Sequence, residues 1–371
     1  MSMDLNSLSL EEKVGQLFFI GIPGPEIDGQ TRKLLTTVSP GGVCLFARNI
    51  REAAQTRRLL DDLRTSLPNA PLLSIDQEGG LVDRLRRITT PMPAANKLNT
   101  AADAGELGGL IASTLGILGF NMDFAPVVDV IDHDRAKSCN GLFSREFGRS
   151  AAEVAQLAGE FLRTLQEGGI IGCLKHFPGL GASKVDSHEE LPEVAITTAE
   201  LESVDLLPYR ELVKTAGVRA IMVAHAAFPE LSLQELDKNG KLLPSSLSRN
   251  FVTGLLREDL GFDGVVITDD LEMGAIVKNY GISEACRKAV HAGVDMLAIC
   301  ADPVRILEGY EAVLLDVRNG SIAEGRITDS LRRIAQLKSD VSEPDVFDLD
   351  QLSLLSLQTQ ALNERLGREK E

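Results

Sequence analysis

Short apolar segments recur along the chain, and polar or amphipathic stretches of helical length separate them. Most of these segments are near-continuous runs of Val, Ile, Leu and Phe, a pattern typical of parallel strands that are covered on both faces. Eight segments have this character: residues 17–22, 42–46, 72–75, 122–130, 170–174, 220–224, 264–267 and 296–299. Helical patterns lie between them, among them residues 52–67, 106–118, 151–166 and 283–292.

Alternation of strand and helix, repeated eight times, predicts an α/β fold with a single (β/α)8 barrel of the TIM type. A doubly wound open sheet is the alternative, but no G-x-G-x-x-G sequence opens a helix after an early strand. Leucines at positions 349, 352, 355, 362 and 366 share one face of a helix, which predicts a closing helix on the outside of the barrel. We therefore expect a barrel over residues 1–340 and a C-terminal helical extension over residues 341–371.

Charge and cysteine usage limit the partners and the compartment. The 371-residue chain has a formal net charge of −16, which argues against nucleic acid or an anionic membrane as a partner because both would repel it. Residues 1–12 lack the basic flank and apolar stretch of a secretory signal, and no apolar run approaches the roughly 18–20 residues that span a bilayer. The five cysteines are widely spaced, and Cys44, Cys173 and Cys300 lie in apolar runs, so buried thiols are expected rather than a disulfide or a metal cluster. These features predict a cytoplasmic protein.

Polar side chains end or follow five of the eight predicted strands. Burying such groups is costly, so they need partners or a function. The carboxyl ends of barrel strands meet at one rim, where barrel enzymes have their active sites, so we expect a common site there. A carboxylate that caps the following helix is the alternative at any single position. The groups are Asp76-Gln77-Glu78 after the third strand, Asp129 at the end of the fourth, Lys175-His176 after the fifth, His225 after the sixth and Asp269-Asp270 after the seventh.

The loop over residues 175–188 contains Asp186 and His188, two positions apart. In a D-x-H sequence the carboxylate can hold the imidazole in one orientation and stabilise its cationic form, although a solvated loop pair has the same sequence. A metal site would need a third ligand, which His176 or Asp129 could supply. Because neither H-E-x-x-H nor H-x-H occurs, no metal is expected.

Six motifs together resemble one enzyme family. They are K-H-F-P-G-x-G…D-S-H over 175–188, D-Q-E-G-G-x-V-x-R over 76–84, T-D-D-L-x-M over 268–273, F-A-P-V-V-D-V over 124–130, R-E-F-G over 145–148 and G-F-D-G-V-V over 261–266. The chain resembles glycoside hydrolase family 3, and more narrowly its single-domain β-N-acetylglucosaminidases of the peptidoglycan-recycling type. The resemblance covers roughly residues 8–340, in order.

The resemblance implies a retaining enzyme in which Asp269 attacks the anomeric carbon of the sugar, while Asp270 is structural. It also implies that His188, oriented by Asp186, is the general acid/base on a mobile loop. Recognition of the sugar hydroxyls and the N-acetyl group would fall to a set of polar residues: Asp76, Arg84, Arg145, Lys175 and His176.

Three further polar residues leave alternatives open. Glu78 is the rival acid, because paired carboxylates are usual in glycosidases, but in D-Q-E-G-G we expect it to bind neighbouring groups and shape the turn. His225 is a candidate substrate-binding residue, with a partner of Asp269 or a core histidine as alternatives. Asp129 is expected to be structural.

The expected function is hydrolysis of terminal β-linked N-acetylglucosamine from muropeptides or related small soluble fragments of the cell wall, without a cofactor. Trp is absent and three Tyr occur, which leaves few aromatic platforms for a long polysaccharide. The alternatives on the same scaffold are a β-glucosidase and a β-N-acetylglucosaminide phosphorylase, and a non-catalytic sugar-binding barrel is the alternative from a different class. The sequence leaves the aglycone and the oligomeric state open.

Overall fold

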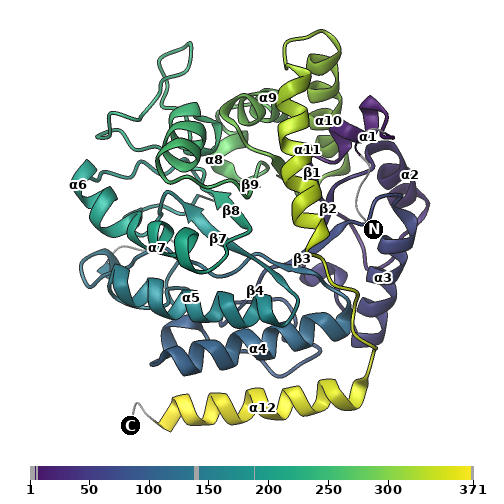
Figure 1. Cartoon of the computed structure of the whole chain (residues 1–371), viewed down its shortest axis with the longest axis vertical. Coiled ribbons are helices and arrows are strands. Elements are labelled where there is room, and N and C mark those ends of the chain that lie inside the picture. Colours follow the sequence, from purple (N-terminus) through teal and green to yellow (C-terminus); the bar gives the residue numbers. More distant parts are fainter. Residues whose placement is uncertain (1–4, 6, 138–141, 188, 369–371) are drawn as a thin grey trace.

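The computed structural model describes residues 5, 7–137, 142–187 and 189–368, and eight of its strands close into a parallel barrel (Figure 1). The predicted (β/α)8 barrel is therefore confirmed. Around the barrel the strands follow the order β1, β10, β9, β8, β7, β6, β3, β2. Their bounds are Phe18–Gly21 (β1), Gly42–Leu45 (β2), Leu72–Ile75 (β3), Met122–Asp123 (β6), Ile171–Phe177 (β7), Ala220–Val223 (β8), Val265–Asp270 (β9) and Met296–Ile299 (β10).

The fourth barrel strand, β6, is much shorter than the predicted segment 122–130. The regular strand ends at Asp123, and beyond it the chain keeps only scattered ladder contacts, because Pro126 has no N–H group to donate. The following residues stay buried against β7, where the Val128 N–H donates to the Lys175 carbonyl at 2.8 Å. The apolar pattern therefore predicted burial correctly, but the prediction of a continuous strand was wrong.

Strands β7 and β9 run further than predicted, and they contain four of the candidate residues. β7 includes Lys175 and His176, and β9 includes Asp269 and Asp270. Neighbouring side chains of a strand point to opposite faces of the sheet. These polar groups are nevertheless all carried to the barrel mouth, by the strands themselves and not by loops after them.

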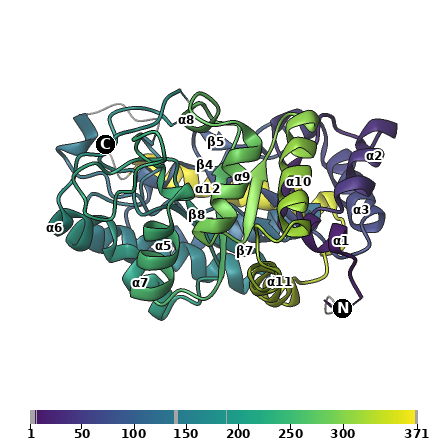
Figure 2. The ribbon, with the colours of Figure 1, turned by 90° about the horizontal axis from the view of Figure 1, so that it is seen from above.

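Helices surround the barrel, as the view from above shows (Figure 2). Three of the four predicted helical patterns match α3, α5 and α9 to within one residue at each end. No helix in the described ranges has both the length and the hydrophobicity needed to cross a bilayer. The bounds are Leu10–Gly15 (α1), Gly29–Val38 (α2), Ala53–Ser66 (α3), Ala101–Leu118 (α4), Ala151–Glu167 (α5), Thr198–Glu200 (α6), Leu207–Thr215 (α7), Gly274–Val277 (α8), Ile282–Ala292 (α9), Pro303–Arg318 (α10), Glu324–Ser339 (α11) and Leu349–Arg368 (α12), with π-helical segments at Leu201–Asp205 and Asn250–Asp259.

Helix α4 begins at Ala101, a full turn before the predicted start at 106. A capping box explains the earlier start, because the Thr100 side chain accepts from the Asp103 N–H and the Asp103 carboxylate accepts from the Thr100 N–H. The sequence T-x-x-D was available as a signal for this start.

Helix α12 lies along α4 at the edge of the molecule, as the yellow helix in Figure 1 shows. The predicted helix is present, and Leu352, Leu355, Leu362 and Leu366 are buried on one face. Leu349 is 55% exposed, contrary to the expectation that it belongs to the packed face. The packed face of the helix therefore begins at Leu352.

A two-stranded antiparallel hairpin, β4 (Gln77–Gly79) and β5 (Val82–Asp83), follows β3 directly. It projects from the carboxyl end of a barrel strand, where the polar residues of the D-Q-E-G-G sequence were expected to gather.

A buried carboxylate, that of Asp295, directly precedes β10, and its loss should destabilise the fold. Asp295 accepts hydrogen bonds from the Val266 N–H at 3.0 Å and Ser330 Oγ at 2.7 Å, and it pairs with Arg257. Asp295→Ala would leave a buried guanidinium unpaired, so we expect the free energy of unfolding in urea to fall by about 3–5 kcal/mol. The matched control is Asp263→Ala in an exposed ion pair, where about 0–1 kcal/mol is expected. Equal losses in the two variants would contradict this account.

Candidate active site

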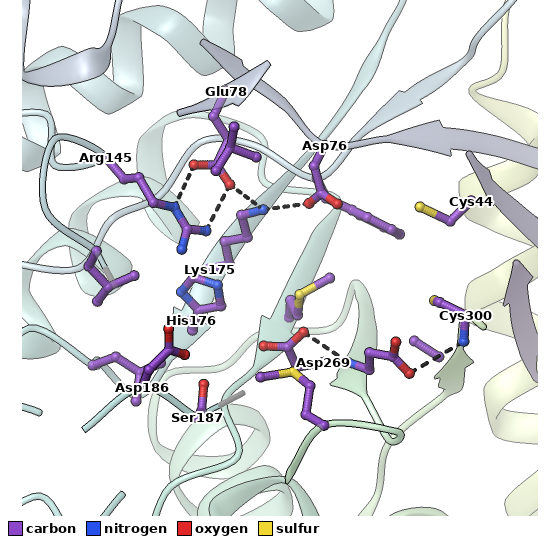
Figure 3. A pocket seen from close by; sticks show the side chains of 18 of the residues that line it. Cys44, Asp76, Glu78, Arg145, Lys175, His176, Asp186, Ser187, Asp269 and Cys300 are labelled. Atoms are coloured by element: carbon purple, nitrogen blue, oxygen red, sulfur yellow. Dashed lines mark hydrogen bonds and ion pairs between the residues drawn. The ribbon is translucent and has the colours of Figure 1, made fainter. Parts of the chain in front are cut away.

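A cavity of about 180 Å³ opens at the carboxyl ends of the barrel strands (Figure 3). Seven of the nine residues predicted for the site line it: Asp76, Arg84, Arg145, Lys175, His176, Asp186 and Asp269. His225 is not among the lining residues. The predicted acid/base, His188, lies outside the described residues.

A network of charges forms one wall of the cavity and joins side chains from strand β7, from the chain around the β4–β5 hairpin and from the loop before α5. Lys175 Nζ lies 2.8 Å from Asp76 Oδ1 and 2.6 Å from Glu78 Oε1. Arg145 grips the Glu78 carboxylate with two hydrogen bonds of 2.8 Å each (Figure 3). Arg84 adds a longer ion pair of 3.7 Å to Asp76. Glu78 therefore binds both Arg145 and Lys175 and holds these two cations at fixed positions beside the cavity.

The neighbouring charges of this network keep Glu78 and Lys175 in their ionised forms. Burial alone would raise the pKa of Glu78, but the charges of Arg145 and Lys175 hold it well below its usual range. Burial alone would lower the pKa of Lys175, but Asp76 and Glu78 raise it. Glu78 therefore stays ionised at neutral pH and has no proton to donate. It binds neighbouring side chains, as expected, and is not placed to serve as the rival acid.

Glu78→Ala is expected to weaken both the fold and the affinity for substrate. The change leaves Arg145 and Lys175 buried without their shared partner, so the free energy of unfolding should fall by about 3–5 kcal/mol. Because the two cations would also lose their positions, we expect KM to rise by about 10- to 100-fold, as for the loss of one or two charge-assisted hydrogen bonds. Urea denaturation and steady-state kinetics measure the two effects, and an unchanged KM in the folded variant would contradict the second.

Asp129 is fully buried and orients His176. Its Oδ2 lies 2.7 Å from Nδ1 of His176, and its Oδ1 accepts from the Leu180 N–H at 2.7 Å. One carboxylate therefore fixes both the imidazole that lines the cavity and the start of the segment that leads to Asp186. The structure places Asp129 in the structural role expected for it.

Asp269 lies at the tip of β9 and lines the cavity. Its Oδ1 accepts from the Asp270 N–H at 2.8 Å (Figure 3). The Asp270 carboxylate points away toward the next strand, where it accepts from the N–H groups of Glu272 at 3.0 Å and Cys300 at 3.3 Å. Burial raises the pKa of Asp270 to about 7. Both adjacent residues line the cavity, but their carboxylates have different environments: that of Asp270 is held by two backbone N–H groups, and that of Asp269 accepts from the Asp270 N–H.

His225 lies behind the tip of β9 and is fully buried. Nδ1 is 2.7 Å from Ser246 Oγ, and Nε2 is 3.1 Å from the carbonyl oxygen of Asp270. A carbonyl needs a donor, so the proton is on Nε2 and Nδ1 accepts from the serine hydroxyl. Burial also lowers the pKa of His225, although Asp269 acts in the opposite direction. His225 therefore holds the backbone beside Asp269, which agrees with the alternative of a partner for Asp269, and its role in substrate binding stays a prediction.

Asp186 comes from a segment that lines the side of the cavity facing Asp269 (Figure 3). The segment is held at both ends. A Cβ at Gly181 would lie 1.9 Å from the Val130 carbonyl oxygen, so no larger residue fits without moving the chain. At the other end the Ser187 carbonyl accepts from the N–H of Ala275 in α8 at 3.2 Å. These contacts set where Asp186 and Ser187 meet the cavity.

Two thiols also line the cavity, but their environment does not favour the reactive thiolate form. Cys44 and Cys300 are buried and unpaired, and burial raises the pKa of both thiols. Buried thiols were predicted for these residues and for Cys173, and the structure confirms them. Within the described residues, no group of three or more His, Cys, Asp or Glu side chains could hold a metal ion.

Residues 9–337 match the model of the glycosyl hydrolase family 3 N-terminal domain. The chain belongs to glycosyl hydrolase family 3. A β-hexosaminidase of Tolumonas auensis is 34% identical over 300 residues, which cover 79% of this chain and 86% of that protein. A β-hexosaminidase of Pseudomonas aeruginosa is 34% identical over 287 residues, which cover 76% of this chain and 82% of that protein.

Solved structures of family 3 proteins share the architecture of this family 3 chain. A β-N-acetylglucosaminidase from a Paenibacillus species superposes with a TM-score of 0.85 at 37% identity, covering 96% of this chain and 69% of that one. NagZ of Neisseria gonorrhoeae, in complex with N-trifluoroacetyl-D-glucosamine, superposes with a TM-score of 0.75 at 27% identity, covering 94% and 96%.

Proposed function

We propose that this family 3 protein is a retaining β-N-acetylglucosaminidase that removes terminal β-linked N-acetylglucosamine from small soluble fragments of the cell wall, such as muropeptides. The observation on which the proposal rests is the shared cavity, because Asp269 on β9 and Asp186 on the facing segment line the same space. The names of the relatives, β-hexosaminidase and β-N-acetylglucosaminidase, support the choice of sugar.

In the proposed mechanism Asp269 attacks the anomeric carbon, and the glycosidic oxygen leaves with a proton from His188. The product of this step is a glycosyl ester of Asp269. Water then attacks the same carbon after giving a proton to His188, which frees Asp269 and releases the sugar with its original configuration. Histidine suits both steps because its unperturbed pKa of about 6.5 lies near neutral pH. The Asp186 carboxylate stabilises the imidazolium form.

Substrate recognition is assigned to the charged wall, by which we mean the side of the cavity formed by Asp76, Glu78, Arg84, Arg145 and Lys175. The ammonium group of Lys175 and the guanidinium groups of Arg84 and Arg145 can donate to sugar hydroxyls and to the acetamido carbonyl, and Asp76 can accept. These groups are already paired with carboxylates, so they meet the substrate in fixed positions and lose little freedom on binding. The cavity is small, which favours removal of a single terminal sugar.

We propose the same organisation and compartment as the sequence predicts. A barrel over residues 1–340 with an extension over 341–371 is supported by the family match, which ends at residue 337. A cytoplasmic location is supported by the unpaired, buried thiols.

A panel of aryl glycosides tests the proposed function. We expect release from the aryl β-N-acetylglucosaminide, at least about tenfold slower release from the aryl β-glucoside because the acetamido contacts are absent, and no dependence on phosphate. Proton NMR of the first product should show the β-anomer. A preference for the glucoside, formation of a sugar phosphate when phosphate is added, or an initial α-anomer would each overturn one part of the proposal, and absence of turnover would favour the sugar-binding alternative.

A further inference from the structure

The β4–β5 hairpin brings Glu78 into the charged wall, and a stretch of irregular chain supports this hairpin from outside. We call residues 90–94 the support segment. The Asp83 carboxylate in β5 accepts from the Met92 N–H at 2.9 Å. The Gly80 N–H, at the tip of the hairpin, donates to the Met92 carbonyl at 3.0 Å. One residue of the support segment therefore binds the hairpin at two places.

The packing between the hairpin and the support segment leaves no room for adjustment. Gly79 has a φ of +87°, and a Cβ there would lie 2.2 Å from the Pro93 carbonyl oxygen. At Gly80 a Cβ would lie 2.5 Å from the Cβ of Ala94. The two backbones are in direct contact, so a shift of the support segment would displace the hairpin and Glu78 with it.

Helix α12 binds the support segment from its other side. Leucines of α12 pack into the hydrophobic core, and three polar side chains of the helix reach three consecutive residues of the segment. The contacts are Ser356 Oγ accepting from the Thr90 N–H at 3.3 Å, Asn363 Nδ2 donating to the Pro91 carbonyl at 2.9 Å, and Thr359 Oγ1 at 3.6 Å from the Met92 sulfur.

We infer that α12 positions the sugar-binding hairpin through the support segment, so that the C-terminal extension contributes to affinity for the substrate. No residue of α12 lines the cavity, and the helix lies beyond the part of the chain that the family model matches. The helix therefore acts through Met92, Asp83 and the hairpin backbone, and its residues are positioning residues. The kinetic readout of this inference rests on the proposed function.

The first test removes two of the three polar contacts in the full-length protein. Ser356 and Asn363 are partly exposed, so Ser356→Ala combined with Asn363→Ala should leave the fold intact. With the aryl β-N-acetylglucosaminide we expect KM to rise about three- to tenfold, while kcat stays within about twofold, because the charged wall is displaced and the reacting groups are not. A conservative single variant, Ser356→Thr, retains Asn363 and keeps a hydroxyl at position 356. We expect this variant to have the wild-type KM.

Arg365→Ala is the matched control on the same helix. It removes the ion pairs of α12 with Asp103 at 2.9 Å and Glu106 at 2.7 Å, both in α4, and leaves the three contacts to the support segment in place. We expect an unchanged KM. The inference is overturned if Arg365→Ala raises KM as much as the double variant does, or if the double variant has the KM of the wild type.

Hydrogen exchange separates this inference from the proposed function. Amides of residues 77–85 should exchange faster in the double variant than in the wild type or in Arg365→Ala, and this holds whichever glycoside the protein cleaves. Wild-type protein without turnover would refute the proposed function alone. Unchanged exchange in the hairpin would refute the positioning role.

Discussion

Asp269→Ala is expected to abolish turnover of an aryl β-N-acetylglucosaminide. We expect kcat to fall by about 10⁴-fold or more, the usual size of the effect when a covalent nucleophile is removed. In the proposed mechanism this carboxylate forms the bond to the anomeric carbon, and alanine has no atom that can replace it. The side chain lies at the cavity wall and not in the packed core, so the variant should fold normally. Release of the aryl group, compared at equal circular dichroism signal, measures the effect.

Asp270→Asn is the matched control for this prediction. Asparagine keeps a carbonyl oxygen that can accept from Glu272 and Cys300, so the loss of activity should stay within about tenfold. A second variant identifies the nucleophile directly. In Asp269→Gly, added azide should restore part of the turnover and yield the α-glycosyl azide, because it enters from the face that the carboxylate leaves empty. Near-wild-type turnover of Asp269→Ala would contradict the assignment.

His188→Ala and Asp186→Asn are expected to impair the same step. Loss of a general acid/base costs about 10²- to 10⁴-fold, and the loss should be largest for alkyl glycosides, because their leaving oxygen needs the proton most. In the proposed mechanism the Asp186 carboxylate stabilises the imidazolium, so its replacement is expected to lower the pKa of His188 and move the alkaline limb of the pH–rate profile to lower pH.

A double-mutant cycle tests whether the pair works as one unit. If it does, the double variant should be about as slow as His188→Ala alone, because Asp186 acts on the reaction through the imidazole. Initial rates are measured for the wild type, the two single variants and the double variant, on an alkyl and an aryl glycoside over a range of pH. The dyad would be refuted if Asp186→Asn kept the wild-type rate and pH profile while His188→Ala was inactive.

Most of the fold could be predicted from the sequence because its signals are local. Strands buried on both faces appear as continuous apolar runs, and helices appear as amphipathic stretches between them, so the eightfold alternation was enough for a barrel. The segment 122–130 shows the limit of that signal. Apolar residues mark burial, but Pro126 cannot donate to a ladder, and the chain beyond Asp123 continues buried with interrupted pairing to β7.

The candidate site was predictable as a set of residues but not as an arrangement. Polar groups after apolar runs, together with the resemblance to family 3, identified seven residues that line one cavity. The same pattern put His225 beside them, since position along a strand cannot tell which face of the sheet a buried imidazole occupies. Glu78 was expected to bind neighbouring groups, but its partners could not be named.

The sequence by itself determined the barrel, the positions of the carboxylates along its strands and the presence of a C-terminal helix, because burial and periodicity depend on residues close together in the chain. Only the tertiary structure decided that Glu78 holds Arg145 and Lys175, that His225 supports the backbone beside Asp269, and that α12 contacts the support segment behind the hairpin. These pairings join loops far apart in sequence. Their distances are set when the eight strands close, and no local pattern of residues encodes them.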